Sequence, residues 1–349
     1  MTSAATSTPL RVLITSPLEP EQAARIAAAE PNRIEVLYEP NLLPTPRYVG
    51  DHHGCRRDLT DGEDARWKDL LGSADILFDF DWQAPGEMLD RAPRVRWIQA
   101  TSAGIGESVE KLRLPKERVI LTTAAGVHAQ PLAEFALTSA LYFAKDIPAL
   151  RQWQRDRRWE RYCGHELLGA RALIVGLGSV GQRTAQLFAA LGLHVVGQRR
   201  SVTTSPPPGV VRVIGEDGID AELPGTDYVV IAAPGTPETR HLLDKRRLAL
   251  LPPSAVLINI GRGTIVDEAA MIRALQTGRL RGAALDVFEH EPLPKESPLW
   301  SMPHVLISPH SASTVEHEND RIVDIFIENL RRYLAGRPLL NRFDYDRGY

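Results

Sequence analysis

A glycine-rich turn between an apolar strand and a helix constrains the fold of this chain more than any other stretch. Residues 172–175 form the short apolar run that a buried parallel strand needs. Gly176, Gly178 and Gly181 follow in G-x-G-x-x-G spacing, which permits a tight turn and lets a pyrophosphate approach the backbone. Residues 182–191 lack Gly and Pro and predict a helix whose first amides face that pyrophosphate. A dinucleotide site is therefore favoured over a purely structural turn.

Strand and helix signals alternate along the chain, which predicts an α/β protein with doubly wound parallel sheets. The 349 residues suffice for two domains, and 43% hydrophobic with 24% charged residues is ordinary for a globular protein. The formal net charge of −3 gives no indication of a nucleic-acid partner. Because no stretch has the roughly 20 apolar residues of a membrane helix, we expect no membrane partner either.

The cysteines and histidines give no metal-site signal. Cys55 and Cys163 have neither a disulfide pattern nor zinc spacing, which favours a reducing, cytoplasmic location. His52 and His53 are adjacent within a loop-like section over residues 40–62. Since no carboxylate or cysteine follows them at ligand spacing on a regular element, we expect a solvated loop and no metal.

Two further segments carry apolar or aromatic residues that need covering. Residues 131–143 predict a helix that is opened by a proline and is apolar around most of its circumference, so we expect it to be buried between domains or subunits. Residues 145–164 are charged but contain Trp153, Trp159 and Tyr162. This segment either packs on a partner subunit or folds on its own domain, and the sequence leaves both interpretations open.

Three polar residues follow predicted strands at the edge where ligands of an open parallel sheet bind. They are Arg262, Glu291 and His310. Taken singly, each is explained by a solvated loop, but together they fit hydride transfer to a 2-oxoacid. Arg262 would hold the carboxylate and polarise the carbonyl, and His310 would give the carbonyl oxygen a proton. Glu291 would bond the other imidazole nitrogen and raise the histidine pKa.

A series of stretches between Arg171 and Ala312 resembles the NAD(P)-dependent D-isomer-specific 2-hydroxyacid dehydrogenase family, in the family's order. They read Gly-Leu-Gly-Ser-Val-Gly181, Ala-Pro-Gly-Thr-Pro-Glu-Thr-Arg-His-Leu242, Asn-Ile-Gly-Arg-Gly263, Ala-Leu-Asp-Val-Phe-Glu-His-Glu-Pro-Leu293 and Ser-Pro-His-Ser-Ala312. Such a series is more specific than any one motif. It implies two Rossmann-like domains with the active site in the cleft between them.

The domain limits that the resemblance implies make the substrate-binding domain discontinuous. It comprises residues 10–127 and 312–349, and the dinucleotide-binding domain over 128–311 lies between these two parts in the sequence. The two chain crossings would act as hinges, so that domain closure excludes water from the hydride path. We expect residues 1–9 to be a flexible tail.

The resemblance implies the catalytic roles given above and adds binding residues. The substrate would be held by the backbone amides of Ser102, Ala103 and Gly104, together with Arg262 and His310. The cofactor-binding residues that it implies are Gly176, Gly178, Ser179, Val180, Gly181, Ala233, Pro234, Ile260, Gly261, Asp286 and Ala312.

The chain departs from the family pattern at two places. Arg199, followed by Arg200 and Ser201, stands where an Asp or Glu would hold the ribose diol of NAD. Two guanidiniums and a hydroxyl suit a 2′-phosphate, so we predict that these residues bind it and that NADP(H) is preferred, with NAD(H) as the other cofactor. The alternative is that the arginines point to solvent and specificity is loose. Gly106 stands where many members have Asp, which weakens substrate inference from relatives.

The sequence thus predicts a 2-oxoacid reductase that acts as a D-2-hydroxyacid dehydrogenase in reverse, on a small acid such as glyoxylate or hydroxypyruvate. One alternative is a relative that uses another donor, such as formate or phosphite. Another is a non-catalytic NADP(H)-binding sensor or corepressor on the same fold. The resemblance also implies a homodimer through residues 131–165. The sequence leaves the physiological acid, the pathway and the regulation open.

Overall fold

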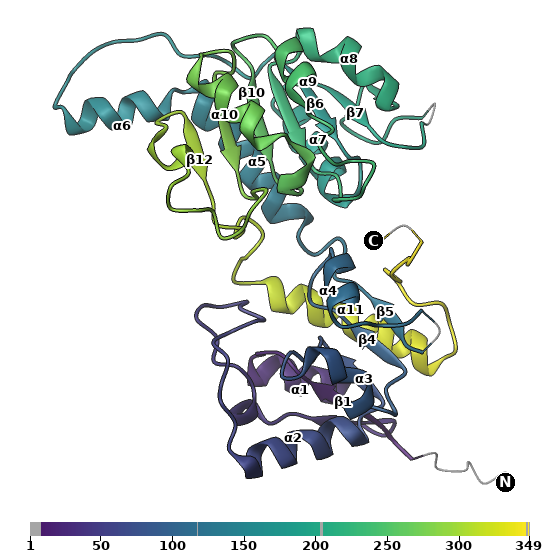
Figure 1. Cartoon of the computed structure of the whole chain (residues 1–349). Helices are drawn as coiled ribbons and strands as arrows, with labels where there is room; N and C mark the ends of the chain where they lie inside the picture. Colours follow the sequence, from purple (N-terminus) through teal and green to yellow (C-terminus); the bar gives the residue numbers. More distant parts are fainter. Residues whose placement is uncertain (1–7, 117, 203–204, 347, 349) are drawn as a thin grey trace. The chain divides into compact units, whose positions relative to one another are not determined.

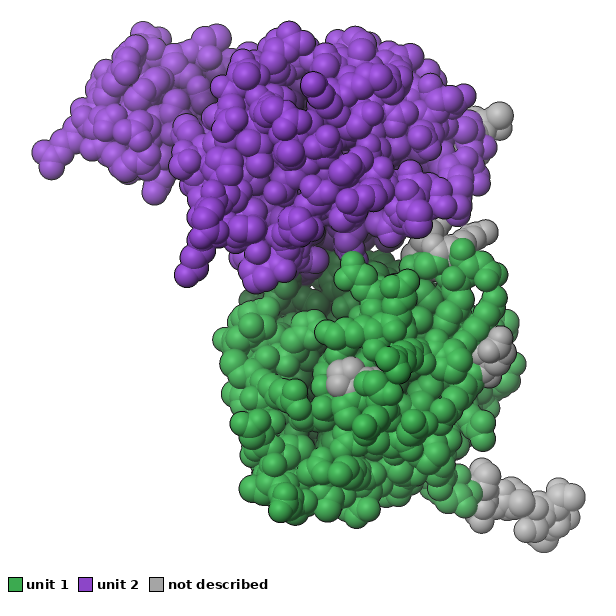
Figure 2. All heavy atoms as spheres, in the orientation of Figure 1, with its two compact units in different colours: residues 1–128, 314–349 green, residues 129–313 purple. Residues whose placement is uncertain are grey.

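The chain forms two compact units, which a computed structural model describes over residues 8–116, 118–202, 205–346 and 348 (Figures 1 and 2). Unit 1 comprises residues 1–128 and 314–349, and unit 2 comprises residues 129–313. These limits lie one residue beyond the expected domain limit at the first crossing and two beyond it at the second. Of the expected tail, residues 1–7 lie outside the described residues.

Unit 1 is built on a five-stranded parallel sheet with the strand order β2-β1-β3-β4-β5. This is the flavodoxin-like order of doubly wound sheets. All residues of β3 and β4 are buried, as in strands that are covered on both faces. The strands are β1 (Leu10–Ile14), β2 (Ile34–Leu37), β3 (Ile76–Phe78), β4 (Trp97–Gln99) and β5 (Ile120–Thr122). The helices are α1 (Pro20–Ala29), α2 (Asp61–Ser73), α3 (Met88–Arg91), α4 (Gly106–Lys111) and α11 (Glu318–Leu334).

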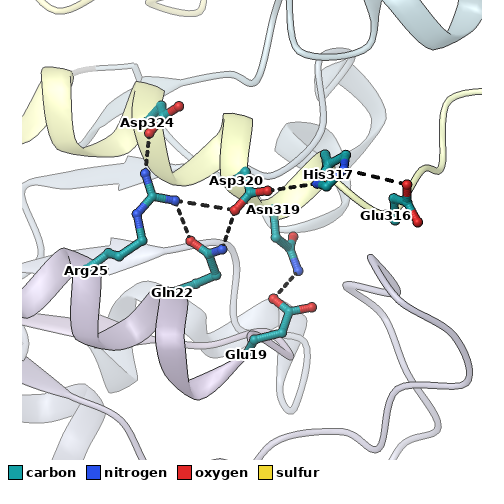
Figure 3. Close-up of polar contacts among 8 residues, drawn as sticks. All are labelled: Glu19, Gln22, Arg25, Glu316, His317, Asn319, Asp320 and Asp324. Atoms are coloured by element: carbon teal, nitrogen blue, oxygen red, sulfur yellow. Dashed lines mark hydrogen bonds and ion pairs between the residues drawn. The ribbon is translucent and has the colours of Figure 1, made fainter.

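The C-terminal helix α11 is part of unit 1 through an aromatic stack and a polar seam. Phe326 on α11 stacks on Trp97 of β4 with ring centroids 5.1 Å apart and planes 12° apart. Figure 3 shows the polar seam between the first turns of α11 and α1. Its hydrogen bonds run from Gln22 Nε2 to Asp320 Oδ1 (2.5 Å), from Arg25 Nη2 to Asp324 Oδ1 (2.5 Å) and from Asn319 Nδ2 to Glu19 Oε2 (2.7 Å). These contacts make unit 1 discontinuous in sequence.

Unit 2 contains a seven-stranded parallel sheet with the order β12-β11-β10-β9-β6-β7-β8. Six of these strands have the Rossmann order, with the topological switch between β6 and β9, and β12 extends the sheet. The strands are β6 (Arg171–Val175), β7 (His194–Gln198), β8 (Arg212–Ile214), β9 (Tyr228–Ile231), β10 (Val256–Asn259), β11 (Gly282–Leu285) and β12 (Val305–Ile307). The helices are α5 (Ala129–Ala144), α6 (Ile147–Arg155), α7 (Ser179–Ala190), α8 (Ile219–Glu222), α9 (Lys245–Leu250) and α10 (Glu268–Gln276). The two parallel α/β sheets confirm the predicted fold class.

Short 3₁₀ helices lie in the connections. They are η1 (Pro40–Leu42), η2 (Pro85–Glu87), η3 (Glu216–Gly218), η4 (Leu223–Gly225), η5 (Gly263–Ile265) and η6 (Pro298–Ser301).

The two helices that follow the first chain crossing differ in how far they are buried. Helix α5 packs on α7 and on strands β10 and β11 of its own unit, which accounts for its apolar surface. Helix α6 has no buried residue, and Figure 1 shows it standing off the body of unit 2. Trp159, just beyond it, is 98% exposed. Its own domain therefore leaves α6 and Trp159 uncovered, and of the two interpretations that the sequence left open, packing on a partner subunit stays a prediction.

His52 is only partly exposed, with 10% of its side-chain surface accessible, so the expectation of a solvated loop is wrong at this residue. Its Nε2 lies 3.5 Å from Glu318 Oε1, and the same oxygen lies 3.0 Å from His128 Nε2. Glu318 opens α11 shortly after the second chain crossing, and His128 is the last residue of unit 1 before the first. This His52–Glu318–His128 cluster therefore ties together, within unit 1, the two segments that lead to unit 2.

The cluster predicts an acid-sensitive contribution to stability. Burial raises the pKa of Glu318, but the hydrogen bonds and charges of His128 and His52 outweigh it and lower that pKa to about 2. A carboxylate whose pKa is lower in the folded than in the unfolded protein stabilises the fold at pH values above the unfolded-state pKa. This stabilisation is lost as the pH falls through the folded-state pKa. We expect Glu318→Gln to lower the free energy of unfolding by about 3 kcal/mol at pH 6 and by much less near pH 2. Thermal unfolding at the two pH values measures the difference.

Glu316→Gln is the matched control for that prediction, because Glu316 is 82% exposed and pairs with the exposed His317. It should leave the unfolding temperature within about one degree of the wild type at both pH values. A loss for Glu318→Gln that is equal at pH 6 and pH 2 would contradict the electrostatic explanation.

Candidate active site

Three glycines shape the turn between β6 and α7. Gly176 has φ +96°, and a Cβ there would lie 2.6 Å from the backbone of Ala233. A Cβ on Gly181 would overlap the carbonyl oxygen of Gly176. At Gly178, in contrast, φ is −73° and a Cβ would meet no described atom within 4 Å. Neither the backbone conformation nor the packing within the protein requires a glycine at position 178. A ligand that lies directly against the backbone of the turn would require one.

The first turn of α7 supplies unpaired donors beside this glycine. The N–H groups of Ser179, Val180 and Gly181 donate to no described residue, as expected for the start of an α-helix. Such amides and the helix dipole favour an anion. The residues of the turn therefore fit the pyrophosphate of a dinucleotide.

The loops after β9 and β10 pack directly against that turn. Ala233 is buried, and it is the residue that Gly176 approaches. A Cβ on Gly261 would lie 2.7 Å from the carbonyl oxygen of Ala233, and Ile260 is buried beside it. Among the predicted cofactor-binding residues of these two loops, Pro234 is exposed, whereas Ala233, Ile260 and Gly261 are buried. The backbones at this edge of the sheet are therefore too closely packed to admit a ligand between them.

Arg199 follows the strand next to the glycine turn. The N–H of Gly176 donates to the carbonyl of Gln198, the last residue of β7, at 3.0 Å, and Arg199 is the first residue after this strand. Its side chain is half-buried, whereas Arg200 and Ser201 are exposed. The residues predicted to bind the 2′-phosphate, 199–201, thus begin directly after the residue of β7 that is hydrogen-bonded to the glycine turn.

Arg262 is held by the last residue of β10. Asn259 is 1% exposed, and its Oδ1 accepts from Gly261 N at 3.1 Å while its Nδ2 donates to Arg262 O at 3.1 Å. The stem of Arg262 packs over Gly235, and its Nη1 donates to Gly261 O at 2.8 Å. Asn259 is not among the residues that the sequence predicts for the site. The available signal was a polar residue in the final position of an apolar strand.

His310 and Glu291 form a hydrogen-bonded pair, with Nδ1 and Oε2 2.7 Å apart. The other oxygen of Glu291 accepts from Phe288 N at 3.0 Å. The hydrogen bond that His310 Nδ1 donates to Glu291 raises the pKa of His310, and the charges of Glu291 and Asp286 raise it further, whereas burial and the charge of Arg262 lower it. Burial raises the pKa of Glu291, but the bonds from His310 and Phe288 and the charge of Arg262 lower it overall. The three predicted catalytic residues therefore lie close enough to act on one another's charge.

Asp286 holds the turn that carries His310. It is 2% exposed, and its Oδ1 accepts from Ser308 Oγ (2.6 Å), Ser311 N (2.9 Å) and Ala312 N (2.9 Å). The N–H of His310 donates to the carbonyl of Asp286 at 2.9 Å. His310 has φ +53°, a conformation that a non-glycine residue keeps only where its surroundings impose it. Asp286 thus fixes the backbone on both sides of the histidine.

The predicted substrate loop lies in unit 1, directly after β4. Ser102, Ala103 and Gly104 are exposed, and their N–H groups donate to no described residue. The preceding Thr101 is buried, and Ser102 O accepts from Ala124 N at 3.0 Å. A short run of unpaired backbone amides is a site that suits a carboxylate.

The described residues contain no group of three or more His, Cys, Asp and Glu side chains placed to hold a metal ion. A search of the same residues finds no helix with the length and apolarity needed to cross a bilayer.

Residues 137–312 match the family model of the D-isomer specific 2-hydroxyacid dehydrogenase, NAD binding domain. The chain belongs to the D-isomer specific 2-hydroxyacid dehydrogenase family. This confirms the resemblance that the sequence motifs indicated.

Solved and curated relatives extend the likeness over most of the chain. A family member from Xanthobacter autotrophicus Py2, in complex with NADPH and MES, is 32% identical with a TM-score of 0.78, covering 98% of this chain and 100% of that one. An NADPH-dependent glyoxylate/hydroxypyruvate reductase from Sinorhizobium meliloti, in complex with NADP and sulfate, is 28% identical with a TM-score of 0.76, covering 97% and 100%. The glyoxylate reductase of Thermococcus gammatolerans is 31% identical over 261 residues, which are 72% of this chain and 77% of that protein.

Other relatives are longer than the region of similarity. The D-3-phosphoglycerate dehydrogenase of Mycobacterium tuberculosis is 33% identical over 252 residues, which are 72% of this chain but 47% of that protein. The chain thus spans about half the length of these curated relatives.

The His310–Glu291 pair predicts a pKa change on substitution. Because the hydrogen bond donated to Glu291 is the largest cause that raises the pKa of His310, Glu291→Gln should lower that pKa. An NMR titration of the His310 ring measures it. Glu289→Gln is the control, since Glu289 Oε1 bonds His241 Nε2 at 2.6 Å instead. A His310 titration curve that Glu291→Gln leaves unchanged would contradict the prediction.

Proposed function

We propose that this chain is an NADP(H)-dependent 2-oxoacid reductase of the glyoxylate/hydroxypyruvate type. The observation that carries the proposal is the hydrogen-bonded His310–Glu291 pair, under the charge of Arg262, at the carboxyl edge of the sheet that holds the glycine turn. Ligands of open α/β sheets bind at this edge. Unit 2 would be the dinucleotide-binding domain and unit 1 the substrate-binding domain.

The catalytic residues would divide the chemistry between them. A bound NADPH supplies the hydride that reaches the carbonyl carbon. His310 donates the proton from Nε2 to the carbonyl oxygen, because Nδ1 is engaged by Glu291. The products are the 2-hydroxyacid, NADP⁺ and a neutral His310, which regains its proton from solvent. Arg262 holds the substrate carboxylate or the carbonyl oxygen with its planar donors.

The raised pKa of His310 suits the reductive direction. A histidine that keeps its proton at higher pH is a proton donor over more of the neutral range. Glu291 stabilises the charged imidazolium before the proton leaves and holds the ring orientation. Reduction would therefore slow as pH rises through the folded pKa of His310.

The cofactor would bind along the glycine turn and the loops that follow β7, β9, β10 and β11. Gly178 and the amides of residues 179–181 would take the pyrophosphate, and Arg199 the 2′-phosphate, with Arg200 and Ser201 as its exposed neighbours. Two similar solved proteins are complexes with NADPH or NADP. Asp286, Ile260 and Gly261 would lie by the nicotinamide, with Ala233, Pro234 and Ala312 completing the lining.

A small 2-oxoacid is the proposed substrate, and its carboxylate would reach the amides of residues 102–104. The two relatives described above as glyoxylate or glyoxylate/hydroxypyruvate reductases favour this class. Cys55 and Cys163 are both free and exposed, which suits a reducing cytoplasm.

A homodimer would cover the segment around α6. Trp153 and Tyr162 pack edge to face with centroids 5.4 Å apart, and Arg158 lies over the Trp153 ring. The segment therefore has its own order, yet α6 has no buried residue and Trp159 is almost fully exposed. Exposed aromatic side chains on an ordered projection are typical of a protein interface.

An initial-rate assay of 2-oxoacids with NADPH and with NADH tests the function. We expect glyoxylate or hydroxypyruvate to be reduced, with the higher kcat/KM for NADPH. Arg262→Ala and His310→Ala should each lower kcat by at least about 100-fold, while NADPH affinity changes little. His290→Ala, an exposed histidine next to Glu291, should stay within about twofold of wild type.

Three outcomes of this assay would count against the proposal. Near-normal rates in the Arg262 or His310 variants would refute their roles. Tight NADPH binding without turnover of any acid would favour a sensor. An NADPH/NADH ratio that Arg199→Asp leaves unchanged would show that the phosphate is recognised elsewhere.

Sedimentation equilibrium tests the dimer. The wild type should sediment at twice 38.6 kDa, and Trp159→Glu should shift it towards the monomer because a charge at the centre of an apolar contact is costly. Trp300→Glu is the control, since Trp300 is 53% exposed elsewhere on unit 2. A monomeric wild type would contradict the proposal.

A further inference from the structure

A buried carboxylate without a cationic partner lies at the carboxyl end of β3. Asp79 is 4% exposed and directly follows Phe78, the last residue of that strand. No ion pair joins it to any residue that the structure describes. Its φ of +73° is also unusual for a residue other than glycine. A buried charge and a left-handed backbone both oppose folding, so the position points to a function.

The carboxylate of Asp79 bonds one residue through both of its oxygens. Oδ2 accepts from Thr101 Oγ1 at 2.9 Å, and Oδ1 accepts from Thr101 N at a longer 3.4 Å. The N–H of Asp79 donates to the carbonyl of Gln99, the last residue of β4, at 2.8 Å. Asp79 therefore binds the chain at the end of β4 through both its backbone N–H and its side chain.

The residue that Asp79 holds directly precedes the proposed substrate loop. Thr101 is 3% exposed and immediately precedes Ser102, whose carbonyl accepts from Ala124 N at 3.0 Å. The loop is thus anchored at its start and on one side. The amides of residues 102–104 stay exposed and have no acceptor among the described residues.

Unit 2 contains a related arrangement around its proposed catalytic turn, although there the N–H and the carboxylate of the aspartate bind the two opposite neighbours of its strand. Asp286 directly follows β11, its N–H donates to the last residue of β10 at 3.0 Å, and its carboxylate accepts a hydroxyl and two amides from the chain after β12. Asp79 likewise follows a strand and accepts a hydroxyl and an amide from the chain after the neighbouring strand. In unit 2 the chain segment so held carries His310.

We propose that Asp79 is a positioning residue that aims the amides of residues 102–104 at the substrate carboxylate. The inference rests on the proposed function of that loop. Asp79 acts through Thr101 and does not touch substrate. Its contribution is geometric, because its negative charge by itself disfavours a second anion nearby.

Three variants separate the geometry from the charge. Asp79→Gly accepts the left-handed backbone but removes the clamp. Asp79→Asn also tolerates that backbone and still reaches both groups of Thr101, without the charge. Thr101→Val removes the hydroxyl and keeps the shape of the side chain. Asp75→Asn is the matched control, because Asp75 is a buried aspartate at the amino end of the same strand, bonded to Arg11 N and Arg94.

The readouts are kcat and KM for glyoxylate, the Kd for NADPH, and the Kd for oxalate as an unreactive carboxylate. For Asp79→Gly and Thr101→Val we expect the KM and the oxalate Kd to rise by about tenfold. The kcat and the NADPH Kd should change by less than about threefold. Asp79→Asn should restore both constants to within about threefold of wild type, and Asp75→Asn should leave them unchanged.

The proposal is overturned if Asp79→Gly keeps the wild-type KM and oxalate Kd. It is also overturned if Asp79→Asn is as impaired as Asp79→Gly, or if Asp75→Asn raises KM to the same extent. Should Asp79→Gly fail to fold, Thr101→Val and Asp79→Asn decide the question by the same constants. A wild type that neither reduces a 2-oxoacid nor binds oxalate refutes the proposed function itself, and with it this inference.

Discussion

The close approach of backbones at the carboxyl edge of the seven-stranded sheet is the constraint on which the rest of unit 2 depends. Gly176 presses against Ala233, and Gly261 presses against the same residue from the next loop. A Cβ on Gly263 would overlap the backbone of Phe288, two loops away in sequence. Because these contacts are between main chains, a side chain larger than hydrogen at these glycines would force the loops apart. Arg262 lies between Gly261 and Gly263, so close backbone packing on both sides restricts the position of its main chain.

The proposed catalytic pair, His310 and Glu291, also depends on the contacts at this edge. Phe288, which packs on the Gly263 backbone, also gives its N–H to Glu291. Glu291 in turn bonds His310, whose turn is bound by Asp286. The loops after β10, β11 and β12 thus form one chain of contacts that ends at the imidazole. A catalytic group that is positioned in this manner needs little reorganisation when a substrate arrives.

The sequence was informative where function demands an uncommon residue at a fixed spacing. The three glycines, Arg199 and the polar residues after strands were all identifiable, because each breaks the apolar or helical pattern around it. The sequence analysis did not identify helix α2, although Thr60 and Glu63 form a capping box at its start. That segment is largely polar, so its periodicity is weak.

Side chains whose role depends on partners far along the chain were not predictable. His52 was assigned to solvent, yet its partner Glu318 lies 266 residues later in the sequence. Asp79 and Asn259 each follow or end a short apolar strand, where a polar residue is equally common in an ordinary turn. Only the paired neighbouring strand shows which backbone groups these side chains bind.

The aspartates after β3 and β11 show that one geometry can have opposite electrostatic consequences. In unit 2 the negative charge of Asp286 adds to that of Glu291 in raising the pKa of His310, so the brace also favours the protonated acid. In unit 1 the charge of Asp79 lies behind amides that would receive an anion, so the brace opposes the binding that its geometry assists. A carboxylate is nevertheless suited to both places, because its two oxygens accept several donors at irregular angles. For the proposed function, the geometry that Asp79 gives residues 102–104 must therefore outweigh its repulsion of the substrate anion.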